Sequence, residues 1–254
     1  MAELLTFSLL GLFIAFAIGL TGVGAGTLTA PILILLGFDP TKAVGSALTF
    51  SAVVKLPAGL LHALYGNLDY SLLKRMLLGG IPGVFTGSYL LSKLSLSQGL
   101  KNLLLLIMGF TILFSLSLNL LYLFKRLRID LTRYSYLLPF ACFLIGLEVG
   151  LTSAGAGALG MVLLLYFTRL EVSKCVGTDT AFGFACSLLG SGSHIILGHL
   201  EEGLFLPMAL GGMIGIFLGT RLTRIINPKP LRLAISLLLF FVALNLIRRG
   251  LGYG

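Results

Sequence analysis

The chain has 254 residues, of which 57% are hydrophobic and 11% are charged. Soluble domains carry about 25% charged residues, so this composition excludes an ordinary soluble protein and indicates a polytopic membrane protein. The net charge of +9 would suggest a nucleic-acid partner for a soluble protein. Here the positive residues lie in loops between apolar segments, which the positive-inside rule explains. We therefore expect the lipid bilayer and no nucleic acid as partner, and one membrane domain over residues 1–254.

Ten apolar segments follow one another, and all are expected to be helices. In chain order they cover about residues 4–20, 27–37, 42–66, 70–92, 100–124, 134–151, 158–168, 174–198, 203–223 and 231–247. The second and the seventh have only about 11 residues, or about 16 Å as helices, whereas crossing a bilayer takes about 20 residues. We expect each short segment to be the return arm of a re-entrant helical hairpin, which enters the membrane and comes back on the same side.

A glycine-rich break precedes each short segment. The first is Thr21-Gly22-Val23-Gly24-Ala25-Gly26-Thr27, and the second is Thr152-Ser153-Ala154-Gly155-Ala156-Gly157-Ala158. Lipid cannot satisfy exposed backbone groups, so such a break is tolerated only where it is buried in protein or lines a polar cavity. We expect the two breaks to meet and form the functional site.

The chain contains one internal repeat, at an offset of 131 or 132 residues. The offset pairs Gly24 with Gly155, Gly45 with Gly177, Phe50 with Phe182, His62 with His194 and Gly80 with Gly212. A single register through unlike residue types argues against chance matches among glycines. The halves, about residues 1–125 and 130–254, are expected to be structural repeats, each with one re-entrant hairpin plus three transmembrane helices.

The positive residues indicate how the halves are oriented. If each hairpin returns to its own side, each half makes an odd number of crossings and the repeats are inverted. One face then holds twelve positive residues and the other five, with Lys55 inside a helix, whereas an uninterrupted crossing at each break would split them eight to nine. Only the inverted arrangement gives a clear orientation, and it places both termini outside.

Inverted repeats with interrupted helices are the architecture of secondary transporters, whose substrate binds near the membrane midplane. Helix N-termini at the breaks would offer an anion free N–H groups and the positive end of the helix dipole. The hydroxyl groups add donors and the glycines allow close approach. The predicted substrate-binding residues of the breaks are Thr21, Gly22, Gly24, Gly26, Thr27, Thr152, Ser153, Gly155 and Gly157. The alternative is that these small residues only allow close helix packing.

Lys55 lies near the middle of segment 42–66. A charge at membrane depth is costly and usually faces a cavity, so Lys55 is the side chain expected to neutralise the anion. The alternative is a structural ion pair with Asp179 or Glu148. These two acids are themselves candidates for proton coupling, unless they bond to local backbone or pair with a cation.

His62 and His194 occupy equivalent positions near helix ends. They are candidates for gating or proton transfer, with polar capping of the helices as the alternative. Two distant histidines lack a ligand set for a metal ion, so neither a metal site nor a cofactor is expected.

The residues around the breaks resemble a known family. Gly19-Leu20-Thr21-Gly22-Val23-Gly24-Ala25-Gly26, then Pro31, Gly37-Phe38-Asp39-Pro40 and Lys42-Ala43-Val44-Gly45-Ser46, resemble the TauE/SafE family of sulfite exporters. The second half, with residues 150–157 and 174–179, is similar to that family's second copy. The resemblance implies a prokaryotic plasma-membrane protein that moves sulfite, organosulfonates or related small sulfur-containing anions, without fixing one substrate.

The two copies differ chemically. Gly22 in the first corresponds to Ser153 in the second, and Lys55 corresponds to Ser187. The pseudo-symmetric site is therefore unequal, and one half is expected to bind more strongly than the other.

We expect a transporter, not an enzyme, that moves a small sulfur oxyanion. Moving one charge across 100 mV is worth about 2.3 kcal/mol, so an inside-negative cell expels anions without a coupling ion and export is the expected direction. An anion channel that uses the same breaks is the first alternative. The sequence does not indicate the oligomeric state.

An intramembrane hydrolase is a weaker alternative, because Gly190-Ser191-Gly192-Ser193-His194 places serines beside a histidine. Neighbouring residues on a helix point in different directions, however. The equivalent first-half stretch, residues 59–62, contains no serine.

Overall fold

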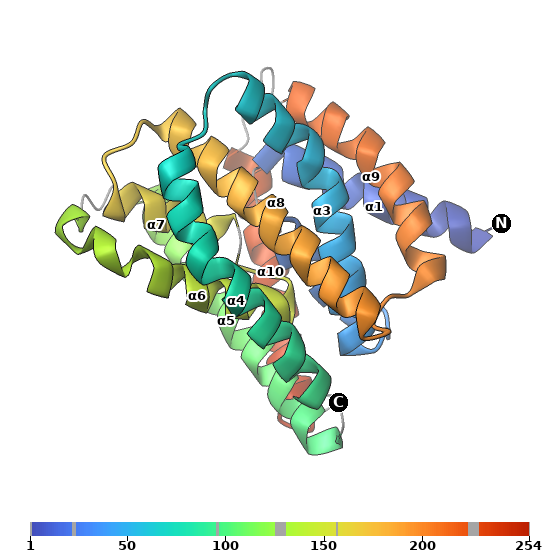
Figure 1. Cartoon of the computed structure of the whole chain (residues 1–254). Coiled ribbons are helices and arrows are strands. Elements are labelled where there is room, and N and C mark those ends of the chain that lie inside the picture. The colour runs from blue at the N-terminus through green and yellow to red at the C-terminus, as the bar shows by residue number, and fades with distance from the viewer. Residues whose placement is uncertain are drawn as a thin grey trace.

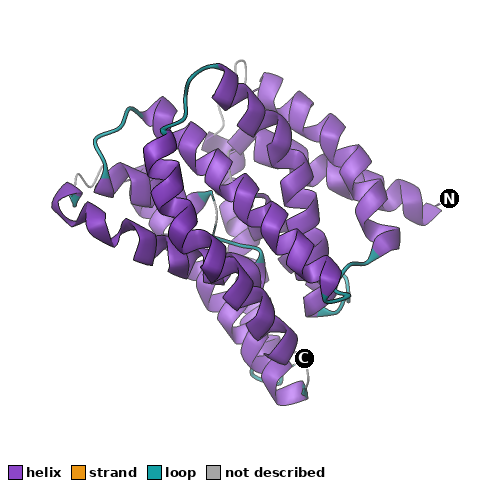
Figure 2. Ribbon diagram, viewed as in Figure 1, coloured by secondary structure: helices purple, strands orange, loops and turns teal. Residues whose placement is uncertain are grey.

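A computed structural model describes residues 2–21, 24–94, 97–124, 131–155, 157–222 and 229–253. The described chain is built of helices and contains no strand (Figures 1 and 2). The helices are α1 (Ala2–Thr21), α2 (Ala25–Leu35), α3 (Pro40–Leu64), α4 (Tyr70–Leu94), α5 (Gln98–Phe124), α6 (Leu138–Thr152), α7 (Ala158–Phe167), α8 (Val172–Ile196), α9 (Glu202–Leu222) and α10 (Lys229–Gly250). A short 3₁₀ helix, η1 (Thr132–Leu137), leads into α6. The prediction of an all-helical protein is confirmed.

Local residues set the helix boundaries. Asp39 caps α3 by accepting a hydrogen bond from the Thr41 amide at 3.0 Å. Pro40 occupies the first helical position, where its missing N–H costs nothing. The helix therefore begins two residues earlier than predicted. Gly66 and Gly198 have φ angles of +68° and +71°. This left-handed conformation ends α3 and α8 just before the positions that hydrophobicity alone predicts.

Two short helices follow the glycine-rich breaks. α1 ends at Thr21 and α2 begins at Ala25, while Gly22 and Val23 lie outside the described residues. α6 ends at Thr152, and α7 follows from Ala158. α2 has 11 residues and α7 has 10, so neither is long enough to cross a bilayer.

Helices from the two halves pack on one another. The most extensive pairs are α1 with α9, α4 with α6, α3 with α8 and α5 with α10. Glycines allow the backbones to approach: Gly211 and Gly215 of α9 pack on the carbonyl groups of Ser8 and Leu12 in α1. The residue numbers rise together along this contact, so α1 and α9 run in the same direction.

The α4–α6 pair repeats this arrangement. Gly79 and Gly83 of α4 pack on the carbonyl groups of Pro139 and Phe143 in α6, again with both residue numbers rising. Small residues at such interfaces let the van der Waals contacts of whole helices form, which drives helix association in membranes. α4 and α6 therefore also run in the same direction.

α3 and α8 lie side by side at the centre of the molecule (Figure 1). The hydroxyl oxygens of Thr49 and Ser191 are 2.7 Å apart, and Ser187 donates a hydrogen bond to Ser51 at 3.2 Å. The residue numbers rise in opposite senses, so the two central helices are antiparallel. Polar contacts between helices take the place of hydrogen bonds to water, which the membrane does not supply.

An aromatic ring fixes the neighbours of each central helix. The Phe50 ring of α3 packs on Gly212 of α9, and the Phe182 ring of α8 packs on Gly80 of α4. Phe50 and Phe182 are equivalent in the sequence repeat, and so are Gly80 and Gly212. Each phenylalanine contacts the glycine of the other half. The same contact, a phenylalanine ring of a central helix on a glycine of a neighbouring helix, therefore occurs twice.

Six described stretches are long and apolar enough to cross a membrane, which indicates a multi-pass membrane protein. They are Glu3–Leu20, Pro40–Leu64, Gly99–Ser117, Thr132–Thr152, Gly203–Leu222 and Leu233–Gly250. The set includes most of α1 and all of α6, which were predicted as hairpin arms. It omits α4 and α8, whose charged and small polar residues lower their hydropathy.

Replacing Gly79 by alanine is expected to lower the free energy of unfolding by about 1–3 kcal/mol, the usual cost of overpacking. The new Cβ would lie 1.7 Å from the Pro139 carbonyl oxygen, so α4 and α6 would have to separate. The matched control is Gly192→Ala in α8, whose Cβ would meet no atom within 4 Å. Thermal unfolding in detergent measures both, and equal midpoints would contradict the packing argument.

Candidate functional site

The two glycine-rich breaks are in contact. The Ser153 hydroxyl donates a hydrogen bond to the Gly26 carbonyl oxygen at 3.0 Å. A Cβ on Gly26 would lie 1.7 Å from the Ser153 carbonyl oxygen, and a Cβ on Gly157 would lie 3.3 Å from the Gly24 Cα. The backbones of residues far apart in the chain therefore touch, and glycine is what permits that approach.

The second break is held in an unusual backbone conformation. Ser153 has a φ of +62°, and Gly155 and Gly157 have φ values of +91° and +116°. The Thr152 hydroxyl donates to the Glu148 carbonyl oxygen at 2.9 Å and accepts from the Ala154 amide at 3.2 Å. The hydroxyl hydrogens of Thr152 and Ser153 are thus engaged with backbone oxygens.

Two helix N-termini converge where the breaks touch. α2 begins after Gly24 and α7 begins after Gly157. Glycine has no side chain with which to cap the first amides of a helix. The Thr27 amide donates to the Gly24 carbonyl oxygen at 3.1 Å, and the Leu159 amide donates to that of Gly155 at 3.1 Å. The amides that precede them, and the positive ends of both dipoles, have no side-chain cap. Thr27 is buried in the first turn of α2. Thr21 is the last residue of α1, and Gly22 lies outside the described residues.

Two acids of the second half point at its break. The Oε2 atom of Glu148 would lie 2.9 Å from a Cβ on Gly155, and the Oδ1 atom of Asp179 would lie 2.0 Å from a Cβ on Gly160 in the first turn of α7. Within the described part of the chain, Glu148 Oε1 and Asp179 Oδ1 are buried and have no hydrogen-bond partner. Bonds to local backbone, one predicted role of these acids, are therefore not made by these two oxygens.

Lys55 stands across from this acidic pair. It is half-buried on α3, close enough to Asp179 on α8 for the two charges to interact. No ion pair between them within 4.0 Å is found among the described residues. The equivalent of Lys55 in the second half, Ser187, is engaged with Ser51. Lys55 is therefore a cation whose counter-charge, Asp179, lies close by without direct contact.

The first half carries no acid at the corresponding positions. Ala17 stands where the second half has Glu148, and Ala47 stands where it has Asp179. Carboxylates near a helix N-terminus stabilise its positive end. The start of α7 therefore has two acidic side chains beside it, whereas the start of α2 has none at the equivalent positions.

Comparison with known proteins agrees with this architecture. A family model described as sulfite exporter TauE/SafE matches residues 7–246. This chain belongs to the TauE/SafE family. The predicted resemblance is thereby confirmed, and membership identifies the chain as a membrane transporter.

Relatives of the TauE/SafE chain in Bacillus subtilis (strain 168) have compatible names. "Probable membrane transporter protein YjnA" is 28% identical over 94% of this chain and 98% of the relative. "Probable membrane transporter protein YunE" is 26% identical over 95% of this chain and 96% of the relative. The corresponding figures for "Probable membrane transporter protein YtnM" are 24%, 90% and 77%. No solved structure matches the chain.

The two predicted histidines of this TauE/SafE protein differ in their surroundings. The Nε2 atom of His194 lies 3.1 Å from the Gly150 carbonyl oxygen, and its Nδ1 lies 3.1 Å from Nδ1 of His199. A carbonyl only accepts, so Nε2 of His194 carries a hydrogen, and its neutral Nδ1 accepts from His199. His62 Nδ1 is buried without a partner in the described residues. His62 differs because Asn67 occupies the position equivalent to His199.

The serines near His194 do not form a hydrolase dyad with it. Ser191 contacts Thr49 at 2.7 Å, and the Ser193 hydroxyl donates to the Leu189 carbonyl oxygen at 2.9 Å. Both ring nitrogens of His194 have other partners. Among the described residues, no serine is placed to be activated by this histidine.

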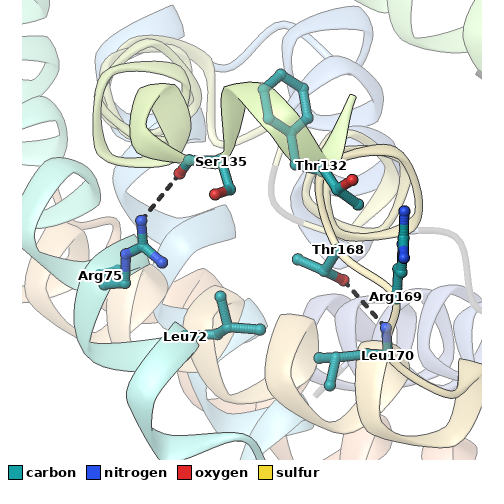
Figure 3. A pocket seen from close by; sticks show the side chains of 8 residues that line it. Leu72, Arg75, Thr132, Ser135, Thr168, Arg169 and Leu170 are labelled. Carbon is teal, nitrogen blue, oxygen red and sulfur yellow. Dashed lines mark hydrogen bonds between the residues drawn. The ribbon is translucent and has the colours of Figure 1, made fainter. Parts of the chain in front are cut away.

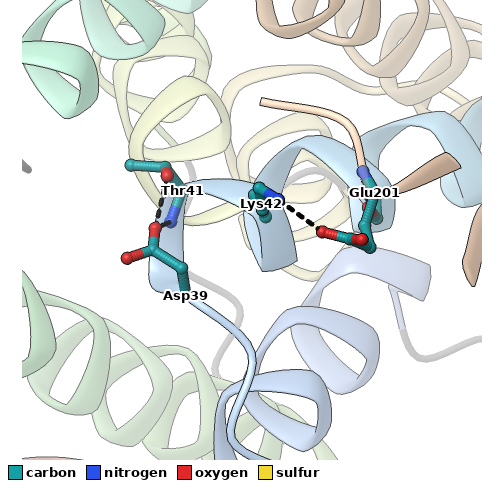
Figure 4. Close-up of polar contacts among 5 residues, drawn as sticks. Asp39, Thr41, Lys42 and Glu201 are labelled. Carbon is teal, nitrogen blue, oxygen red and sulfur yellow. Dashed lines mark hydrogen bonds and ion pairs between the residues drawn. The ribbon is translucent and has the colours of Figure 1, made fainter. Parts of the chain in front are cut away.

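Two ion pairs lie close together at one end of the TauE/SafE fold, one between the halves and one within the first half. Lys42 contacts Glu201 at 2.7 Å (Figure 4), and Lys101 contacts Asp39 at 2.8 Å. Burial by itself would raise the pKa of Asp39, but hydrogen bonds from Lys101 and Thr41 outweigh it and hold that pKa below its ordinary value. Sequence reasoning missed this network, because pairing between distant loops leaves no local pattern.

Removing the Asp39 side chain is expected to make stability less dependent on acid. A carboxyl group with a lowered folded-state pKa stabilises the fold above its ordinary pKa of about 3.9, and loses that contribution as the pH falls through the folded-state value. Asp39→Ala should also lose a helix cap worth about 1 kcal/mol, whereas Asp39→Asn should keep most of it. Melting temperatures between pH 7 and pH 3 would test this. An Asp39→Asn protein with the unchanged acid profile would contradict it.

Proposed function

We propose that the protein carries a small sulfur-containing oxyanion, sulfite or an organosulfonate, across a prokaryotic plasma membrane. The observation that carries the proposal is the convergence of the α2 and α7 N-termini at Gly24 and Gly157. Backbone amides and dipole ends of this kind bind anions without any positive side chain. The family description as a sulfite exporter supports the choice of substrate class.

The anion binds closer to the first half of the site. α2 has no acid at the positions equivalent to Glu148 and Asp179, so its amides are not opposed by negative charge. The α2 terminus with Gly24, Gly26 and Thr27 forms the stronger part, and Lys55 adds a positive charge from beside Asp179. Thr152 and Ser153 hold the second break in shape, since their hydroxyl hydrogens are engaged, and Gly155 and Gly157 leave room for the ligand.

Lys55 supplies the positive side chain. In the empty protein Asp179 balances its charge at a distance, and a bound oxyanion takes over that role. Glu148 and Asp179 are then placed to respond when the anion arrives or leaves, which makes them the residues through which a coupled proton would act.

The helix pairing supports an inverted repeat within one membrane domain. α1 runs with α9, its repeat equivalent α6 runs with α4, and the central helices α3 and α8 are antiparallel. Residue numbers also rise together along the contact of α9 with α3 and along that of α4 with α8. The helices of each of these pairs therefore run in the same direction. These directions suit halves of opposite orientation, with α2 and α7 as the returning arms of the hairpins.

The direction of transport follows from the orientation and the membrane potential. The inverted arrangement gives an outside location for both termini, and the face with twelve positive residues is cytoplasmic. An inside-negative potential drives anions outward at about 2.3 kcal/mol per charge and 100 mV. We therefore propose export.

Sulfite flux from proteoliposomes at imposed potentials tests the function. We expect saturable flux that increases as the sulfite-containing lumen is made negative. Protein-free vesicles are the control. Absence of flux for sulfite and for simple sulfonates, from protein that remains folded, would end the proposal. Single-channel currents in a planar bilayer would favour the channel alternative instead.

A further inference from the structure

A hollow of about 400 Å³ lies away from the breaks, where α4 begins and α7 ends. η1 forms another of its walls. Figure 3 shows Arg75 on one side of the hollow and Arg169 on the other, with the hydroxyl-bearing residues Thr132, Ser135 and Thr168 between them. The rest of its lining is apolar, and none of the described lining residues is acidic.

The arginine positions suit a phosphate group. The Arg75 guanidinium donates to the Ser135 backbone carbonyl oxygen at 3.1 Å, which holds it against the wall of the hollow. A guanidinium presents its donors in a planar fork that matches phosphate oxygens. Because one contact already orients Arg75, little side-chain entropy remains to be lost on binding.

The surroundings suit a phosphate that is attached to a lipid. Leu72, Phe167 and Leu170 line the same hollow as the arginines. Tyr134 and Tyr136 of η1 are 45% and 67% exposed, and exposed tyrosines beside membrane helices gather at headgroup level. Basic pockets between membrane helices are known sites for anionic headgroups. A free phosphate would use the arginines but leave the apolar walls uncovered.

We propose that this hollow binds the phosphate of an anionic phospholipid, such as phosphatidylglycerol, with Arg75 and Arg169 as its ligands. Thr132 and Ser135 supply polar contacts around the phosphate, and the apolar residues contact the glycerol and upper acyl carbons. The Thr168 hydroxyl donates to the Leu164 carbonyl oxygen and only lines the wall. The site is independent of the proposed transport function, because neither arginine lies at the breaks.

Native mass spectrometry of the purified full chain with added phosphatidylglycerol tests the site. An arginine near the membrane surface is worth about 1 kcal/mol towards an anionic lipid, so Arg75→Gln/Arg169→Gln should weaken retention about thirtyfold. The matched control is Lys74→Gln/Arg133→Gln, which removes two exposed positive charges near the same end but outside the hollow. The control should lose less lipid than Arg75→Gln/Arg169→Gln, because its charges lie outside the hollow. Phosphatidylcholine, whose choline cation offsets the phosphate charge, should distinguish the three proteins less than phosphatidylglycerol does.

A second variant separates lipid binding from folding. Ser135→Glu places a carboxylate in the hollow and leaves the backbone carbonyl that Arg75 uses, so it should weaken retention while the protein unfolds at the parent temperature. Equal losses in the control pair, or no loss in either test variant, would overturn the proposal. Inorganic phosphate that displaces the lipid at equimolar concentration would also overturn it, since the site would then recognise free phosphate.

Discussion

Gly26→Ala is expected to reduce transport at least about 100-fold, the effect of displacing a binding group by about 1 Å. The added Cβ would lie 1.7 Å from the Ser153 carbonyl oxygen. That oxygen belongs to the backbone and cannot swing away as a side chain would. The two breaks would have to separate, which moves the α2 N-terminus away from that of α7. Sulfite flux in proteoliposomes measures the effect.

The control for this variant is Gly59→Ala in α3. Its Cβ would meet no atom within 4 Å, and alanine in a helix interior is favoured over glycine by about 0.5–1 kcal/mol. Parent-like flux from Gly59→Ala beside lost flux from Gly26→Ala would tie transport to contact between the breaks. A Gly26→Ala protein that transports at the parent rate would show that the contact is not part of the site.

Lys55→Met is expected to abolish sulfite flux. The anion would lose the positive side chain that is proposed to neutralise it, and Asp179 would be left to oppose it. The variant should also be less stable, because Asp179 keeps its burial, 5% exposed, and loses the nearby positive charge. Flux and thermal unfolding are measured on the same preparations, with the exposed Lys74→Met as control.

The double variant Lys55→Met/Asp179→Asn distinguishes substrate binding from a structural ion pair. It removes both charges, so stability should return towards that of the parent. Flux should stay lost if Lys55 binds the anion. Recovery of both stability and flux would mean that Lys55 serves only to balance Asp179.

Segments of the fold were predictable where the cause is local. Hydrophobic runs predicted the ten helices, and glycines in an apolar context predicted the interruptions after Thr21 and Thr152. Both predicted ends of α3 were displaced by two residues, because Asp39 caps its start and Gly66 ends it. Capping depends on one hydrogen bond or one φ angle, which a count of apolar residues does not register.

Contacts between residues far apart in the chain were harder to predict from the sequence. The sequence predicted that the breaks meet, but it did not indicate that the Ser153 hydroxyl would be engaged by Gly26. It also missed His199, the partner of His194, although the repeat offset aligns His199 with Asn67 and could have drawn attention to it. The Arg75–Arg169 hollow depends on three elements meeting in space, so no spacing in the chain reveals it.

The packing of helices from one half on helices from the other limits how such a transporter can change conformation. α1 packs on α9 and α9 on α3, while α6 packs on α4 and α4 on α8. Each of these two bundles therefore contains helices from both halves of the chain. A rigid-body rotation of one sequence half against the other would separate these glycine-lined helix contacts. Motion that preserves them would slide the α1–α3–α9 bundle against the α4–α6–α8 bundle, across the α3–α8 contact and along a surface that passes between Gly26 and Ser153. The ion would then sit on the shear plane itself, where a small displacement opens it to one side and closes it to the other.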